Sequence, residues 1–77
     1  MDFIAYGEKK LLAFEVKSKK RISNKDFTGL KAFKKDYPIA KCYVIHLGEK
    51  REYHDDIEVI PLQEALHMLP NLLDYAG

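Results

Sequence analysis

The alternation of apolar and polar positions predicts short strands separated by turns, together with two helices. Residues 2–6 and 11–17 are rich in β-forming side chains and flank the sequence GEKK, which is typical of a hairpin turn. The segment 11–17 is apolar on both faces until its end, as expected of a central strand covered on both sides. Residues 40–47 predict a third strand and residues 57–61 a fourth, and the charged sequence GEKREYHDD between them predicts a turn with some hairpin character.

The first predicted helix lies between the second and third strands. Ser23 is a suitable N-cap, with Asp26 three residues later as a weak capping box, and Pro38 ends the helical pattern. The apolar stripe at helical spacing comprises Phe27, Leu30, Phe33 and Tyr37. A helix that connects two strands of one sheet implies a parallel crossover, so we expect a mixed sheet.

The closing helix is predicted to begin at Pro61, because proline is favoured at the first helical position, and to end at Pro70. Its apolar stripe comprises Leu62, Ala65, Leu66 and Leu69. The elements therefore follow the order β-β-α-β-β-α. Residues 1–77 predict a single α/β domain in three layers around a central mixed sheet.

Composition narrows the class of protein. Apolar residues at 47% and charged residues at 32% are typical of a globular protein, and one cysteine, Cys42, excludes an internal disulfide. No apolar run approaches the roughly 18 residues of a membrane span and the N-terminus lacks a signal-peptide pattern, so we expect a cytoplasmic protein with no membrane partner. A chain of this length buries, on folding, only about 60% of the surface that its unfolded form exposes. We therefore expect self-association or a partner subunit to supplement its stability.

Charge is unevenly distributed along a chain whose formal net charge is +1. Between Lys17 and Lys35 eight basic residues accompany a single acid, Asp26, whereas the stretch from Glu49 onward carries seven acids and two basic residues. A basic segment of this kind can contact nucleic-acid phosphates, and the alternative is a solvated lysine face. The predicted DNA contacts directly after the second strand are Lys19, Lys20 and Arg21.

The end of the second strand carries the candidate chemistry. Side chains alternate across a strand, so Glu15 and Lys17 share one face and Val16 points to the other. The hairpin register places Asp2 directly opposite Glu15, with Cβ atoms about 4.5 to 5.5 Å apart. Two carboxylates at that distance repel each other, so we expect a cation between them. Either the Lys17 ammonium or a divalent ion could serve, and hard oxygen ligands suit Mg²⁺ or Mn²⁺.

Asp2 on one strand and Glu15-Val16-Lys17 on the next resemble the metal site of the PD-(D/E)xK nuclease superfamily. Over nearly the whole chain, and most clearly in EVKS, GLKAF, YP and DIEVIP, the sequence is similar to the C-terminal nuclease-like domain of archaeal and bacterial AAA-type ATPases. The helix and strand that normally precede this hairpin, and any phosphate-binding loop, are missing. The resemblance therefore implies a restriction-endonuclease-like domain truncated at its N-terminus, either a fragment or a degenerate copy.

The resemblance also implies roles for these residues. Asp2 and Glu15 would bind Mg²⁺ or Mn²⁺, Lys17 would be the catalytic lysine, DNA would be the substrate, and an AAA-type ATPase domain or subunit the partner. The leading hypothesis is a metal-dependent deoxyribonuclease, in an active or an inactive form. The alternative is a non-catalytic module that binds nucleic acid or assembles subunits beside an ATPase. A Holliday-junction-resolvase-like enzyme shares the short motif, but the later helix and strands fit it less well.

Plainer interpretations stand beside these hypotheses. Glu15 and Lys17 can form an ion pair at the exposed end of a strand, worth under about 1 kcal/mol. Asp2 can be a terminal residue without a fixed partner. The three histidines show no metal-ligand spacing, and Cys42 is expected to be a small core residue.

Overall fold

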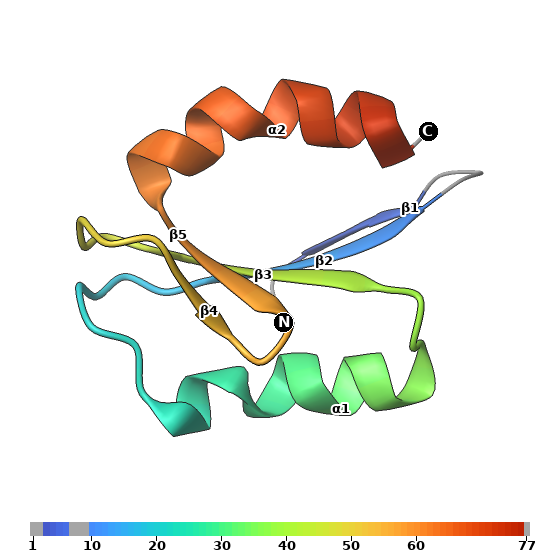
Figure 1. The fold of residues 1–77 in the computed structure, drawn as a ribbon, viewed down its shortest axis with the longest axis horizontal. Helices are drawn as coiled ribbons and strands as arrows, with labels where there is room; N and C mark the ends of the chain where they lie inside the picture. The colour runs from blue at the N-terminus through green and yellow to red at the C-terminus, as the bar shows by residue number, and fades with distance from the viewer. Residues whose placement is uncertain (1–2, 7–9, 77) are drawn as a thin grey trace.

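The computed structural model describes residues 3–6 and 10–76, which fold into three layers (Figure 1). In chain order the elements are β1 (Phe3–Tyr6), β2 (Leu11–Val16), the 3₁₀ helix η1 (Asn24–Phe27), α1 (Thr28–Asp36), β3 (Lys41–His46), β4 (Glu52–His54), β5 (Ile57–Pro61) and α2 (Leu62–Ala76). The strands form one sheet in the order β1-β2-β3-β5-β4. Helix α1 lies against one face of this sheet and α2 against the other.

The sheet is mixed, as the sequence predicts. Strand β1 pairs antiparallel with β2, while β2 with β3 and β3 with β5 are parallel. In the hairpin, Ile4 lies opposite Ala13 and Tyr6 opposite Leu11, which confirms the predicted register for the described residues. The fold is therefore an α/β domain with two parallel connections, one through α1 and one through the short strand β4.

Strand β2 contributes residues to two hydrophobic clusters, one on each face of the sheet. Alternate residues such as Leu11 and Ala13 pack under α1, whereas Leu12 and Phe14 belong to the cluster under α2. The Phe14 ring stacks on Tyr43 of β3, with ring centroids 5.2 Å apart. The continuous apolar run in the sequence thus reflects burial on both faces.

The first helix follows the prediction at both ends. Ser23 and Asp26 form the capping box, and helix α1 ends one residue before its C-cap, Tyr37, which Pro38 follows. The first turn is the 3₁₀ helix η1 rather than α-helix. Tyr37, predicted as part of the apolar stripe, is half exposed and lies against the ring of Phe33.

The sequence prediction was wrong at both prolines of the closing segment. Pro61 is the last residue of β5, where it pairs with His46 of β3. Strand β4 pairs with β5 only as far as Val59, so Pro61 has a neighbouring strand on one side only, a position that tolerates proline. Pro70 lies inside α2, which continues to Ala76. Because proline has no N–H, the carbonyl of Leu66, four residues earlier, loses its helical hydrogen-bond donor. Leu66 and Pro70 are both exposed, so water can bond to that carbonyl and the helix can continue.

The charged sequence 48–56 has the predicted hairpin character, because β4 pairs antiparallel with β5. Its turn contains Asp55 at a φ of 55°, a left-handed conformation that aspartate tolerates better than most residues. Among the described residues, no helix has the length and apolar character needed to cross a lipid bilayer.

Candidate functional site

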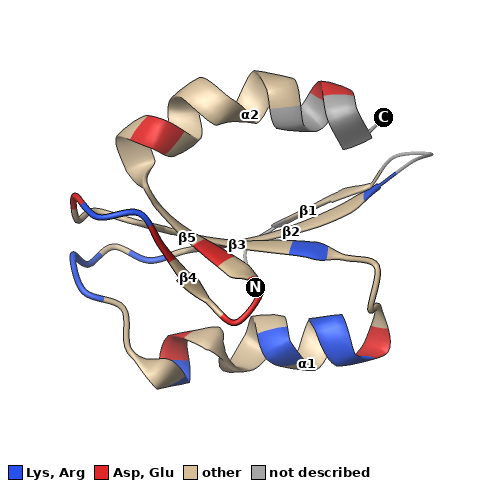
Figure 2. Cartoon of the chain, viewed as in Figure 1, with Lys and Arg blue, Asp and Glu red and all other residues tan. Residues whose placement is uncertain are grey.

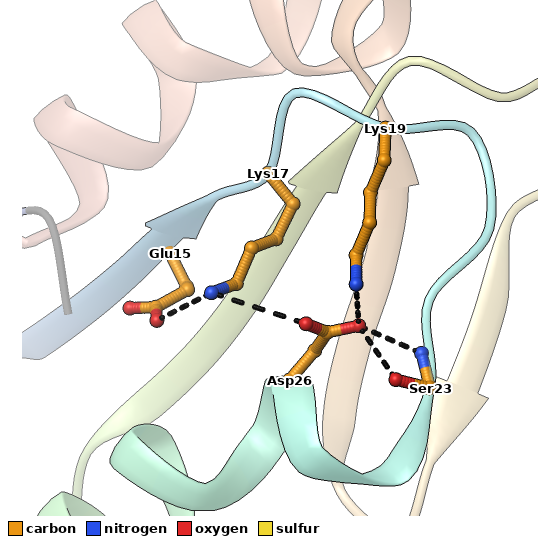
Figure 3. Close-up of polar contacts among 5 residues, drawn as sticks. All are labelled: Glu15, Lys17, Lys19, Ser23 and Asp26. Atoms are coloured by element: carbon orange, nitrogen blue, oxygen red, sulfur yellow. Dashed lines mark hydrogen bonds and ion pairs between the residues drawn. The ribbon is translucent and has the colours of Figure 1, made fainter.

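The carboxyl end of β2 brings two predicted site residues together. Glu15 is the last buried residue of the strand, only 8% exposed, and it shares the α1 side of the sheet with Ala13. Lys17 follows directly, and its backbone N–H donates to the Ile45 carbonyl at 2.8 Å, which fixes the chain beside β3. The Lys17 Nζ lies 3.3 Å from Glu15 Oε1 (Figure 3). Val16 points to the opposite face and is 43% exposed.

Asp26, expected only to cap the first helix, completes this arrangement. It lies on η1, and its side chain is 6% exposed. Its Oδ1 is 3.9 Å from Lys17 Nζ, and its Oδ2 is 2.7 Å from Lys19 Nζ. Figure 3 shows the resulting chain of alternating charges. We call this group the Asp26 cluster; it comprises Glu15, Lys17, Lys19, Ser23 and Asp26.

Hydrogen bonds hold the Asp26 carboxylate in place. Besides the ion pair with Lys19, its Oδ2 accepts from the Ser23 backbone N–H at 2.8 Å and from the Ser23 hydroxyl at 3.1 Å. The bonds from Lys19 and the Ser23 backbone lower the pKa of Asp26 from 3.8 to about 2, against the opposing effect of burial. Asp26 is therefore ionised at neutral pH and holds two lysines near one carboxylate.

A sequence signal for Asp26 existed. It is the single acid among eight basic residues between Lys17 and Lys35, and it begins a helix whose start lies close to the end of the preceding strand. The capping pattern explained Asp26 locally, and its contact with Lys17 could not be recognised because it depends on how the loop 17–23 places η1 beside the end of β2.

The predicted DNA contacts are placed differently from one another. Lys19 is ion-paired with Asp26, whereas Lys20 and Arg21 are exposed on the loop after β2, which Figure 2 colours as containing basic residues. Lys20 and Arg21 line an open hollow of about 640 Å³ between this loop and the loop after β3. The other charged residues of its lining are Glu49, Lys50 and Glu52.

The two loops that border this hollow are joined by their backbones. The Leu47 N–H donates to the Lys19 carbonyl at 2.9 Å. The buried His46 accepts from the Gly48 N–H through Nδ1 at 2.8 Å, which places its proton on Nε2, 3.0 Å from the Lys50 carbonyl. Both ring nitrogens of His46 therefore form hydrogen bonds with backbone groups of the loop after β3, so His46 has a structural role in holding that loop.

A magnesium site in this region depends on Asp2, which lies outside the described residues. Within residues 3–6 and 10–76 no group of three acidic, histidine or cysteine side chains is placed to hold a metal ion. Glu15 offers hard oxygen atoms that suit Mg²⁺. Asp26 fits less well as a second ligand, because its Oδ2 already accepts from Lys19 and Ser23. The pairing of Asp2 with Glu15 stays a prediction, supported by the register of the adjoining residues.

Fold and site together define a mixed α/β domain with paired acidic and basic side chains at the carboxyl edge of its sheet. Residues 1–65 match the model of DUF4143, a domain of unknown function. The match covers most of the chain, so the chain belongs to this family, whose domain occurs in AAA-ATPase-associated proteins. Searches of curated proteins and of solved structures gave no significant match.

Proposed function

We propose that this chain is a nuclease-like domain of restriction-endonuclease-like fold, which acts on DNA in the cytoplasm together with an AAA-type ATPase. One observation carries the proposal: the Glu15 carboxylate and the Lys17 ammonium lie 3.3 Å apart at the carboxyl end of a central strand. This is the edge where loops leave the parallel strands and where α/β proteins most often bind ligands. The basic loop with Lys20 and Arg21 adjoins it.

The proposed roles follow from the chemistry of each group. Glu15 and Asp2 would hold Mg²⁺ or Mn²⁺, which when bound would polarise a phosphate oxygen. The Lys17 ammonium would orient the attacking water and balance negative charge on the phosphate. Lys20 and Arg21 contact the DNA backbone, which positions the strand without reading its sequence.

The test is cleavage of plasmid DNA with Mg²⁺ and then Mn²⁺. We expect Glu15→Gln and Lys17→Met each to reduce the metal-dependent rate by about 10²-fold or more. The matched controls are Glu64→Gln and Lys31→Met, which alter an exposed acid on α2 and an exposed lysine on α1, and both should cleave at the wild-type rate. Equal cleavage by all variants would indicate a contaminant and would contradict the proposal.

A second candidate function is supported by strand β1. This strand forms an edge of the sheet, and its side chains Ile4 and Tyr6 are 46% and 84% exposed. Exposed apolar edge strands favour association with another chain. If the domain is a non-catalytic assembly module, we expect no cleavage with either ion. We also expect light scattering to detect a dimer, which Tyr6→Lys should dissociate.

A further inference from the structure

The Asp26 carboxylate divides its two oxygens between two lysines. Oδ2 accepts from Lys19 at 2.7 Å and from Ser23, while Oδ1 faces Lys17 at 3.9 Å (Figure 3). Lys17 is thereby held between Asp26 on one side and Glu15 on the other. Because Lys19 occupies Oδ2, it does not compete with Lys17 for the place beside Glu15.

We propose that Asp26 is a positioning residue, which holds the Lys17 ammonium beside the Glu15 carboxylate. A lysine side chain is flexible, with four rotatable bonds, and that of Lys17 is 30% exposed. A single neighbouring carboxylate would have to compete with water for the Lys17 ammonium group and would not fix its position. The Asp26 side chain, by contrast, is nearly buried and tied to the backbone of Ser23. A fixed charge of this kind orients a flexible partner.

A purely structural role for Asp26 gives a different expectation. As a helix-capping residue, Asp26 would need only an oxygen that accepts from the Ser23 N–H, and an asparagine supplies that oxygen without the charge. Asp26→Asn therefore separates capping from the attraction of the lysines. Ser23→Ala is the converse variant, because it removes the hydroxyl bond to Oδ2 and leaves the Asp26 charge in place.

The placement of Lys17 is tested by NMR of the ¹⁵N-labelled lysine ammonium groups at low temperature and mildly acidic pH. An ammonium held between two carboxylates exchanges its protons slowly enough to give a signal, which Lys17→Met identifies by its loss. We expect this signal in the wild type, in Ser23→Ala and in Lys19→Met, and its loss in Asp26→Asn. An unchanged Lys17 signal in a folded Asp26→Asn protein would overturn the proposal.

A second measurement covers the case in which Asp26→Asn does not fold. In the wild-type protein, we expect nuclear Overhauser contacts between the ε-methylene protons of Lys17 and the β-methylene protons of Asp26. Their absence would overturn the proposal without any variant. Asp26→Glu, which keeps the charge on a longer stem, should restore the Lys17 ammonium signal that Asp26→Asn loses.

The consequence for catalysis rests on the proposed function, whereas the placement of Lys17 does not. If the wild type cleaves DNA, Asp26→Asn should lower kcat about tenfold or more with little change in KM, because Lys17 would act on the reacting phosphate rather than on binding. A kcat unchanged in Asp26→Asn would overturn the catalytic role. Cleavage absent from the wild type would contradict the proposed function, and the NMR result would still decide the positioning of Lys17.

Discussion

Two lysine–aspartate pairs near the ends of the first helix have nearly the same distance between charged atoms in different surroundings. Lys19 Nζ lies 2.7 Å from Asp26 Oδ2, and Lys34 Nζ lies 2.8 Å from Asp56 Oδ2. The side chain of Asp26 is 6% exposed, however, and that of Asp56 is 63% exposed. The distance between charges therefore does not distinguish the two pairs, and burial does.

The partners of each pair show what this difference means. At the buried end the acid is shared, because Asp26 also accepts from Ser23 and faces Lys17. At the exposed end the lysine is shared, because Lys34 also donates to the Ala40 carbonyl at 2.8 Å. Water can replace the partners of an exposed carboxylate, but a buried carboxylate that loses its partners stays desolvated. The first arrangement organises a candidate site, and the second fastens a turn to a helix.

The largest effect should come from the loops beside the Asp26 cluster. A Cβ built at Gly48 collides with the Lys20 backbone carbonyl and lies 2.9 Å from His46 Nδ1. Gly48→Ala should therefore force the two loops apart and lower the free energy of unfolding by about 1–3 kcal/mol, as overpacking does elsewhere. Urea denaturation measures this loss.

The matched control for that substitution is Gly29→Ala in α1. Gly29 is exposed inside a helix, so alanine should raise the free energy of unfolding by about 0.5–1 kcal/mol. If both substitutions stabilised the protein, the two loops would have room to separate, which would contradict the tight space that Gly48 occupies beside the Lys20 carbonyl.

The second prediction compares how the contributions of Asp26 and Asp56 to the free energy of unfolding depend on pH. The folded-state pKa of Asp26, about 2, lies below its ordinary value of 3.8. Its contribution to stability is therefore complete above about pH 4 and is lost as the pH falls toward 2. Asp26→Asn should be less stable than the wild type at pH 7, and the difference should shrink as the pH approaches 2.

The pKa of Asp56 is also lowered, chiefly by its hydrogen bond from Lys34. Because this pair is exposed, Asp56→Asn should cost under about 1 kcal/mol at pH 7. Urea denaturation of both variants across this pH range is the measurement. Equal losses for the two variants at pH 7 would show that burial adds nothing to the Asp26 pair, contrary to the comparison above.

The fold could be predicted largely because its signals are local. The turn predicted at GEKK implies the hairpin register that β1 and β2 have, and the apolar run of β2 indicates a strand covered on both faces. The prolines misled because their effect depends on tertiary context. Pro70 stops an isolated helix, but Met68 and Leu69 pack against the core and hold α2 in place beside it.

The candidate site could be predicted only in part. Glu15 and Lys17 are two residues apart where β2 ends, so the alternation of side chains along an extended chain places them on one face. The position of Asp26 relative to Lys17 depends on how the 3₁₀ helix packs under the sheet, which no spacing in the sequence reveals. Local capping explained the residue well enough to conceal its second contact.

The smallest effects are expected at the exposed end of the first helix. They test whether the Lys34–Asp56 and Lys31–Asp55 pairs contribute differently to stability. Lys34→Met removes the bond to the Ala40 carbonyl and the ion pair with Asp56, so it should cost about 1 kcal/mol. Lys31→Met removes only a pair with Asp55 at 3.9 Å between two exposed side chains, so it should stay within about 0.5 kcal/mol of the wild type. Salt should weaken only the ionic part of the Lys34 effect, because the bond to a backbone carbonyl joins Lys34 to a neutral group. Urea denaturation at low and high salt separates these contributions. If Lys31→Met costs as much as Lys34→Met, net charge rather than the Ala40 bond stabilises this end of the helix.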